Sequence, residues 1–218
     1  MASKVMICLP SAREPKAGTL FDLARLVNVT KSNSDIEITF ATGSSSLIHD
    51  LRRDLVKDAL KAEADWLLFL DDDMRFPPDA LMRLLKHRRD IVGCNYVTRS
   101  IPPRPTAKMI ADDMMKFYPV PTMPDDTGLL EVDALGFGCV LINARVFKKM
   151  PQPWFSMPWV PQLQYHVGED VFFCIGAGRH DFKVFLDQDL SQEIGHVGNF
   201  TYEWKHFVAT HEMEPDPK

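Results

Sequence analysis

The sequence of 218 residues contains no apolar run approaching the roughly 20 residues that a membrane-spanning helix requires. Its longest apolar stretches, at residues 66–70 and 140–142 with their neighbours, are much shorter. Positive charge is not in excess either, because 25 lysines and arginines stand against 30 aspartates and glutamates. These absences exclude a membrane span and the electrostatic footprint of a non-specific nucleic-acid-binding protein. We expect a cytoplasmic protein.

Cysteine is scarce, and the four that occur are scattered singly through apolar segments. They form neither a C-x-x-C pair nor the dense framework of a small secreted domain. The pattern predicts reduced, buried thiols that pack as small apolar side chains. The residues are Cys8, Cys94, Cys139 and Cys174.

The rest of the composition, with 45% hydrophobic and 25% charged residues, is typical of a globular domain. Over the first hundred residues, short apolar runs alternate with segments of helical periodicity. Alternating strands and helices predict an α/β fold with a doubly wound, mostly parallel sheet and helices on both faces. The expected strands are residues 4–9, 36–41, 66–70 and 91–96, and the expected helices are residues 18–29, 47–64 and 79–86.

The second half is less regular. Residues 98–128 are rich in proline and predict loops and short strands. We then expect strands at residues 136–142 and 182–186, a helical turn at residues 144–150 and a helix at residues 168–178. The whole forms one predicted domain over residues 1–206, with a first half at 1–96, a second half at 97–206 and a tail at 207–218.

Three adjacent carboxylates, Asp71, Asp72 and Asp73, directly follow the apolar strand at residues 66–70. Ligands of open α/β sheets bind beyond the carboxyl ends of the strands, so this place has priority as a functional site. Adjacent carboxylates repel one another, and a divalent cation with hard oxygen ligands would offset that repulsion. The alternative is a solvated acidic turn before the helix that Pro77 and Pro78 open.

Two further clusters are candidates. Glu169 and Asp170 begin the helix expected at 168–178, where either residue could act as a general base or simply favour a helix N-terminus. His196 stands between Gly195 and Gly198, which let backbone approach a ligand, although a lone histidine is often structural.

Together these clusters resemble the glycosyltransferases of the GT-A fold, especially family 2. Leu68-Phe69-Leu70-Asp71-Asp72-Asp73-Met74 is similar to the D-x-D region of those enzymes, and the later Glu-Asp pair and histidine follow in the same order. The likeness extends from about residue 4 to residue 198. It departs from the family pattern at residues 52–54, where Arg-Arg-Asp replaces Ala-Arg-Asn.

The resemblance implies transfer of a sugar from a nucleotide-diphosphate donor, by default a UDP-sugar, to an acceptor hydroxyl. It implies that the nucleotide binds the half at residues 1–96. It also implies inversion at the anomeric carbon with Asp170 as the base and Glu169 orienting either that base or the acceptor, although some members of the fold retain configuration. Asp71, Asp73 and His196 would bind Mn²⁺ or Mg²⁺. The implied donor-binding residues are Pro10, Ser11, Arg53, Asp71, Asp72 and Gly138.

Two other functions compete with this one. A nucleotidyltransferase also combines a nucleotide-binding sheet with acidic metal ligands, but no glycine-rich basic loop follows the first strand. A non-catalytic nucleotide-sugar-binding module would use the same clusters only to hold a ligand. The sequence does not distinguish between three classes of acceptor: a saccharide, a protein and a hydroxylated DNA base. The basic residues at 83–89 either contact phosphate or form a solvated helix face, and the aromatic residues at 154–165 either contact the acceptor or pack in the core.

Overall fold

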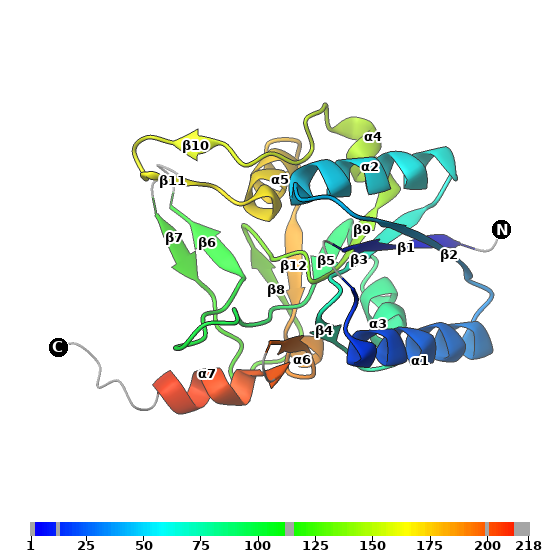
Figure 1. The fold of residues 1–218 in the computed structure, drawn as a ribbon, viewed down its shortest axis with the longest axis horizontal. Coiled ribbons are helices and arrows are strands. Elements are labelled where there is room, and N and C mark those ends of the chain that lie inside the picture. The colour runs from blue at the N-terminus through cyan, green and yellow to red at the C-terminus, as the bar shows by residue number, and fades with distance from the viewer. Residues whose placement is uncertain (1–2, 12–13, 112–115, 199–200, 212–218) are drawn as a thin grey trace.

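The computed structural model describes residues 3–11, 14–111, 116–198 and 201–211. A seven-stranded sheet in the order β2-β1-β3-β9-β5-β12-β8 forms its centre (Figure 1). Strands β2, β1, β3, β5 and β12 run in one direction, whereas β9 and β8 run against their neighbours. The strands are β1 Lys4–Pro10, β2 Glu37–Gly43, β3 Trp66–Leu70, β5 Ile91–Gly93, β8 Leu129–Val132, β9 Cys139–Asn143 and β12 Val184–Asp187.

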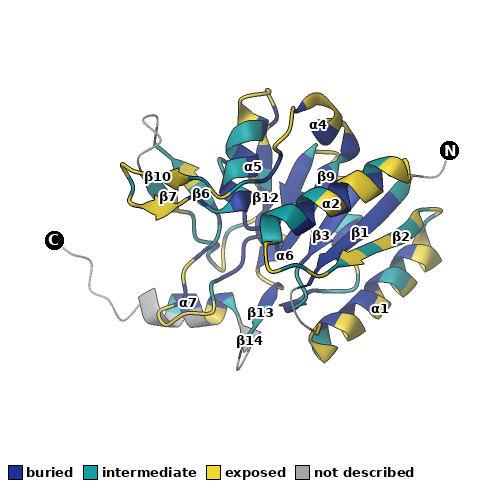
Figure 2. Cartoon of the chain, turned by 45° about the horizontal axis from the view of Figure 1, so that its top comes forward, coloured by how far each residue is buried: buried dark blue, intermediate teal, exposed yellow. Residues whose placement is uncertain are grey.

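Helices cover both faces of this sheet, which confirms the predicted α/β class. Helices α2, α4 and α5 lie on one face, and α1, α3 and α6 lie on the other (Figure 1). The helices are α1 Ala17–Asn33, α2 Ile48–Lys61, α3 Ala80–Lys86, α4 Ala144–Lys149, α5 Glu169–Gly178, α6 Gln188–Ser191 and α7 Trp204–His211. Because both faces are covered, the central strands β1, β3 and β9 are apolar almost throughout and buried (Figure 2).

Short strands supplement the main sheet at one end of the molecule. Strand β13 (Gly195–Val197) pairs with β4 (Met74–Arg75) on one side and with β14 (Thr201–Tyr202) on the other. Two hairpins stand beside α5: β6 (Lys108–Ile110) with β7 (Phe117–Pro119), and β10 (Trp159–Val160) with β11 (Tyr165–His166). The sequence predicts none of these pairings, because their strands are two or three residues long.

Three boundaries differ from the expectation. Strand β5 ends at Gly93, because the backbone N–H of Cys94 bonds the carbonyl of Cys139 and that of Asn95 bonds the hydroxyl of Ser191. The strand expected at 136–142 begins only at Cys139. Helix α7 spans the expected start of the tail at residue 207, while the end of that tail, 212–218, lies outside the described residues.

Several expectations on single residues are settled by burial. All four cysteines are free and buried, as predicted. Trp154 and Phe155 belong to the core, whereas Trp159 and Tyr165 are exposed on the β10–β11 hairpin. In the basic segment, Arg83 pairs with Glu193, and the Arg89 guanidinium lies 4.5 Å from the ring centre of Phe185. None of the helices within the described ranges is both long and apolar enough to cross a membrane.

Candidate functional site

Polar residues follow β1 and β3 at the edge where the carboxyl ends of these parallel strands lie side by side. Ser11 comes directly after Pro10, and its hydroxyl donates a hydrogen bond to the carboxylate of Asp72. The backbone N–H of Asp71 donates to the carbonyl of Gly138, at 3.1 Å. Burial raises the pKa of Asp72, against the opposing effect of the Ser11 hydroxyl. The structure therefore places Pro10, Ser11, Asp71, Asp72 and Gly138 at one edge, as a shared donor site requires.

Arg52 of α2 joins this edge to the start of α5. Its Nη2 lies 2.8 Å from Oδ1 of Asp71, its Nη1 donates to Oε1 of Glu169, and its guanidinium carbon lies 5.2 Å from the ring centre of Phe137. Only 4% of the arginine side chain is exposed. Burial by itself would lower the pKa of Arg52, but the Asp71 and Glu169 carboxylates raise it, so the guanidinium is a fixed positive charge.

Asp73 has two basic neighbours. Its Oδ2 lies 2.6 Å from Nη1 of Arg99, and its Oδ1 lies 3.4 Å from Nε2 of His196. The Nδ1 atom of His196 lies 2.8 Å from the carbonyl oxygen of Val97, so Nδ1 is the protonated donor of that bond. Burial alone would raise the pKa of Asp73, but the neighbouring His196 and Arg99 lower it. This carboxylate is therefore held in its charged form.

The short sheet explains how a histidine far along the chain reaches Asp73. His196 on β13 stands opposite Met74 on β4, and the backbone N–H of Val197 donates to the carbonyl of Asp73 at 2.7 Å. The two residues of β4 come directly after the three aspartates in the sequence. Pairing of β13 with β4 thus fixes the imidazole beside the third carboxylate.

Tyr96 packs between these groups. Its hydroxyl accepts a hydrogen bond from the backbone N–H of Gly138, at 3.1 Å, and its ring meets that of His196 edge to face with centres 5.3 Å apart. A Cβ atom at position 138 would lie 2.8 Å from Tyr96 Cζ and 2.9 Å from Met74 Sδ. The close approach of Tyr96 and Met74 therefore explains why position 138 is a glycine. Burial raises the pKa of Tyr96, so its hydroxyl stays neutral.

Asp170 stands in the first turn of α5, next to Glu169. Its carboxylate folds back to accept the N–H of Val171, at 2.7 Å, and a Cβ at Gly168 would lie 2.7 Å from its Oδ1. Gly168 therefore leaves the space that this carboxylate occupies. Burial and the neighbouring Glu169 charge raise the pKa of Asp170 to about 6, although Arg52 opposes the shift. A carboxylate with this pKa is a suitable general base near neutral pH.

A cavity of about 430 Å³ opens beside Asp170. Thr98, Thr106, Lys108 and Tyr165 supply its polar lining, and Gly168 and Val171 flank the carboxylate. The volume lies within the usual range for small-molecule sites. The cavity places a partly buried carboxylate, an ammonium group and several hydroxyls where an incoming hydroxyl compound could meet them.

The structure brings most of the expected residues together but not Arg53. That side chain pairs with Asp50 and Asp54 on the outer side of α2, away from the carboxylates. The resemblance implied Arg53 as the donor-binding arginine, but it is the neighbouring Arg52 that contacts Asp71 and Glu169. Helical spacing could have identified it, because Arg52 precedes the buried residues Leu55, Val56 and Ala59 by three, four and seven positions.

The residues expected to hold a metal meet that expectation in part. The Nδ1–H of His196 is used by Val97, which leaves Nε2 to face Asp73; metal-binding histidines commonly have one ring nitrogen held in this way. Asp71 is engaged by Arg52 instead. Among the described residues, no group of three acidic, histidine or cysteine side chains is arranged to hold an ion. Of the three expected ligands, the structure brings only Asp73 and His196 together, and Asp73 also contacts Arg99.

Comparison with known proteins supports the fold of this chain but no family. No protein-family model and no curated protein matches the sequence. Among solved structures, the crystal structure of A197 from STIV has a TM-score of 0.53 at 18% identity, covering 89% of this chain and 86% of that chain. At this identity the likeness shows that the two chains share a fold.

Two other solved structures are less similar. TarS 1–349 from S. aureus, in complex with UDP-GlcNAc, has a TM-score of 0.44 at 14% identity over 85% of this chain and 56% of that chain. The 4-diphosphocytidyl-2C-methyl-D-erythritolsynthase from Anaerococcus prevotii has a TM-score of 0.37 at 14% identity, over 67% of this chain and 73% of that chain.

Proposed function

We propose that this chain is a metal-dependent glycosyltransferase that moves a sugar from a nucleotide-diphosphate donor to an acceptor hydroxyl, with inversion at the anomeric carbon. The observation that carries the proposal is the Arg52 bridge. It connects Asp71, at the end of β3, to Glu169, beside Asp170. The donor edge and the partly buried base, which lie far apart in the sequence, are thereby held together, as the resemblance to GT-A enzymes requires.

The donor nucleotide, by default UDP, would lie along the edge formed by Pro10, Ser11, Asp71, Asp72 and Gly138. Asp72 is fixed by the Ser11 hydroxyl, and Asp71 by Arg52, so both carboxylates are oriented before a ligand arrives. Carboxylates oriented in this way can accept hydrogen bonds from the hydroxyl groups of the ribose. Arg53 has no part in this proposal.

Asp73 and His196 would hold Mn²⁺ or Mg²⁺ at the diphosphate. When bound, the cation supplies positive charge where negative charge develops on the leaving group. Arg99, which contacts Asp73, and the buried Arg52 add fixed positive charge near the same carboxylates. Asp73 is kept ionised by its basic neighbours, which suits a metal ligand.

Asp170 takes the proton of the acceptor hydroxyl. The acceptor oxygen then forms a bond to the anomeric carbon, and the bond from that carbon to the diphosphate oxygen breaks, with the electron pair leaving on the diphosphate. Glu169 is held by Arg52 and raises the pKa of Asp170 through its charge, so it positions and tunes the base.

The proposal is tested with Asp170→Asn and Asp73→Asn, with Asp54→Asn on the exposed side of α2 as the matched control. Asp170→Asn should retain binding of the nucleotide sugar and lose transfer by about 10²-fold or more. Asp73→Asn should weaken metal-dependent donor binding, and the control should do neither. Release of nucleotide from sugar nucleotides is followed by chromatography. Transfer by Asp170→Asn at the wild-type rate would refute the base, and full activity in excess chelator would refute the metal.

A further inference from the structure

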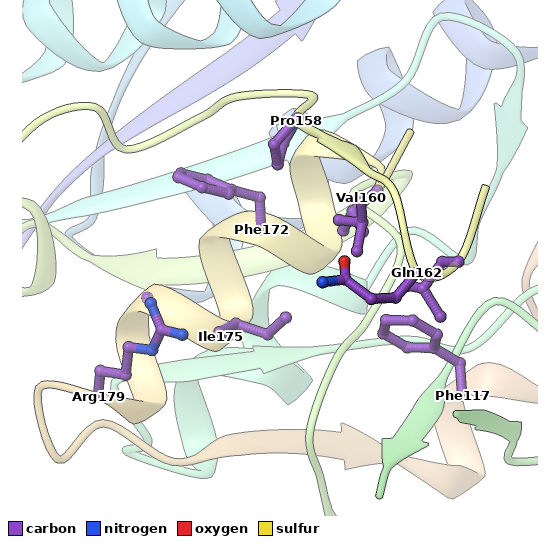
Figure 3. Close-up of a pocket in the computed structure, with 10 residues that line it drawn as sticks. Phe117, Pro158, Val160, Gln162, Phe172, Ile175 and Arg179 are labelled. Carbon is purple, nitrogen blue, oxygen red and sulfur yellow. The ribbon is translucent and has the colours of Figure 1, made fainter. Parts of the chain in front are cut away.

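A second cavity, of about 330 Å³, lies between α5 and the β10–β11 hairpin. In Figure 3, Phe172 and Ile175 extend from α5, Val160 and Gln162 come from the hairpin, and Phe117 of β7 lies at one end. Pro158, Leu163, Val167 and Gly176 complete the apolar part of its lining, with Arg179 at the end opposite Phe117 (Figure 3). A concave site with mostly apolar walls is suited to an apolar group of a small molecule.

This apolar cavity adjoins the one that contains Asp170. Phe117 and Val167 belong to the linings of both, so their side chains form a common wall. Helix α5 runs from one to the other: Asp170 and Val171 face the first cavity, and Phe172 and Ile175 face the second. The apolar cavity therefore begins within one helical turn of the proposed base.

The two cavities differ in chemistry in a way that fits one molecule. The first offers a carboxylate, an ammonium group and hydroxyls, through Asp170, Lys108, Thr98 and Thr106. The second offers aromatic and branched aliphatic side chains. Apolar surface that faces water is unfavourable, and a large exposed apolar patch often marks a binding site.

We infer that the acceptor is an amphiphilic alcohol, whose hydroxyl is presented to Asp170 and whose apolar part occupies the cavity between α5 and the hairpin. This rests on the proposed function and names its acceptor class. An alkyl chain is one such apolar part, and it would bind in the cavity through apolar contacts. A free sugar or another fully polar acceptor would leave this cavity unfilled.

Binding of primary alcohols of increasing length tests the inference without any sugar donor. Ethanol, butanol, hexanol and octanol are titrated into the full chain, and dissociation constants are measured by NMR. Each added methylene should tighten binding by about two- to fourfold until the cavity is full. Equal affinity for butanol and octanol would overturn the proposal.

Two substitutions in the lining and one control outside it locate the binding. Leu163→Asp puts a charge into the apolar lining and should abolish the dependence on chain length, whereas Gln164→Asp, the adjacent exposed position outside the lining, should leave it intact. Val160→Trp fills the cavity from the hairpin and should have the same effect as Leu163→Asp by a different route. Circular dichroism checks that each variant is folded. A chain-length dependence that survives in both folded lining variants would place the site elsewhere and overturn the proposal.

Transfer separates this inference from the proposed function. If wild type glycosylates octanol better than ethanol, and Val160→Trp removes that preference while still hydrolysing the donor, the acceptor class is supported. Donor hydrolysis that octanol neither intercepts nor slows would overturn the acceptor class and leave the proposed function standing. Octanol binding in the cavity without cleavage of any sugar nucleotide would refute the proposed function, and the acceptor class with it.

Discussion

At the scale of single residues, the ionised Asp170 of the candidate site lowers the free energy of unfolding. Its pKa is raised from 3.8 to about 6, because burial and the Glu169 charge disfavour the ionised form. Between these two values the folded chain binds more protons at this position than the unfolded chain does. The free energy of unfolding therefore falls as the pH rises from about 4 to about 6, and the loss persists at higher pH.

Asp170→Asn removes this loss and should stabilise the protein at pH 7.5 by on the order of 1–3 kcal/mol, because a neutral amide of the same shape replaces a disfavoured charge. The gain should shrink toward zero near pH 4, where the wild-type carboxyl is protonated when folded. Urea denaturation of both proteins at several pH values measures it. A variant equally destabilised at every pH would show that the carboxylate is needed for folding instead.

The same scale explains why Arg52 and Arg53 differ although they are neighbours. Arg52 is buried and neutralises two carboxylates, so Arg52→Met should destabilise the fold by about 3–5 kcal/mol by leaving Asp71 and Glu169 without their partner. Arg53 is paired only at the surface, and Arg53→Met should have little effect. Chemical denaturation of the two variants compares them directly. Equal effects would mean that the bridge contributes little.

At the scale of elements, buried polar contacts of Asn95 hold the irregular segments that follow β5. Its Oδ1 accepts the N–H of Ala107 at 3.0 Å, its Nδ2 donates to the carbonyl of Val120 at 2.7 Å, and its backbone N–H donates to the Ser191 hydroxyl at 2.8 Å. Buried backbone groups outside regular strands need such partners. One side chain thus ties the loop after β5 to the segment before β8.

Asn95→Ala should therefore destabilise the protein by about 2–3 kcal/mol, since it leaves a buried N–H and a buried carbonyl unpaired. Asn143 offers the matched control, because its side chain only caps α4 by accepting the N–H of Arg145 at 2.9 Å. Asn143→Ala should cost about 1 kcal/mol, the usual value for a lost N-cap. Thermal denaturation followed by circular dichroism ranks the two variants, and the reverse order would contradict the role given to Asn95.

The elements also show what the sequence reveals and what it does not. Strands β1 and β3 and helix α2 could be predicted, because the period of their apolar residues matches the elements they form. Strand β4 could not, since its two residues are set by pairing with β13. The same holds for the choice of Arg52, whose partners lie at residues 71 and 169. Local pattern predicts elements, whereas the site is assembled by contacts across the chain.

At the scale of the whole molecule, a ligand that binds the folded chain and bridges these distant segments should stabilise all of it. The proposed donor edge uses residues from β1 and β3, and the proposed metal ligands include His196 of β13. Unfolding separates these elements and destroys the site, so binding shifts the equilibrium toward the folded state by mass action. The shift reports on the assembled site independently of turnover.

UDP with Mn²⁺ should therefore raise the melting temperature of the wild type. A ligand at about 100 times its dissociation constant adds about 2.7 kcal/mol, which corresponds to roughly 5–10 °C for a chain of this size. Excess chelator should remove most of the rise, and His196→Ala should reduce it. The rise is measured from each variant's own melting temperature without ligand, because the substitution also removes the Val97 hydrogen bond and the contact with Tyr96. Differential scanning fluorimetry with UDP, GDP and CDP also identifies which nucleobase the donor carries. An equal rise with and without Mn²⁺ would remove the cation from the proposed site, because nucleotide binding would then not require it.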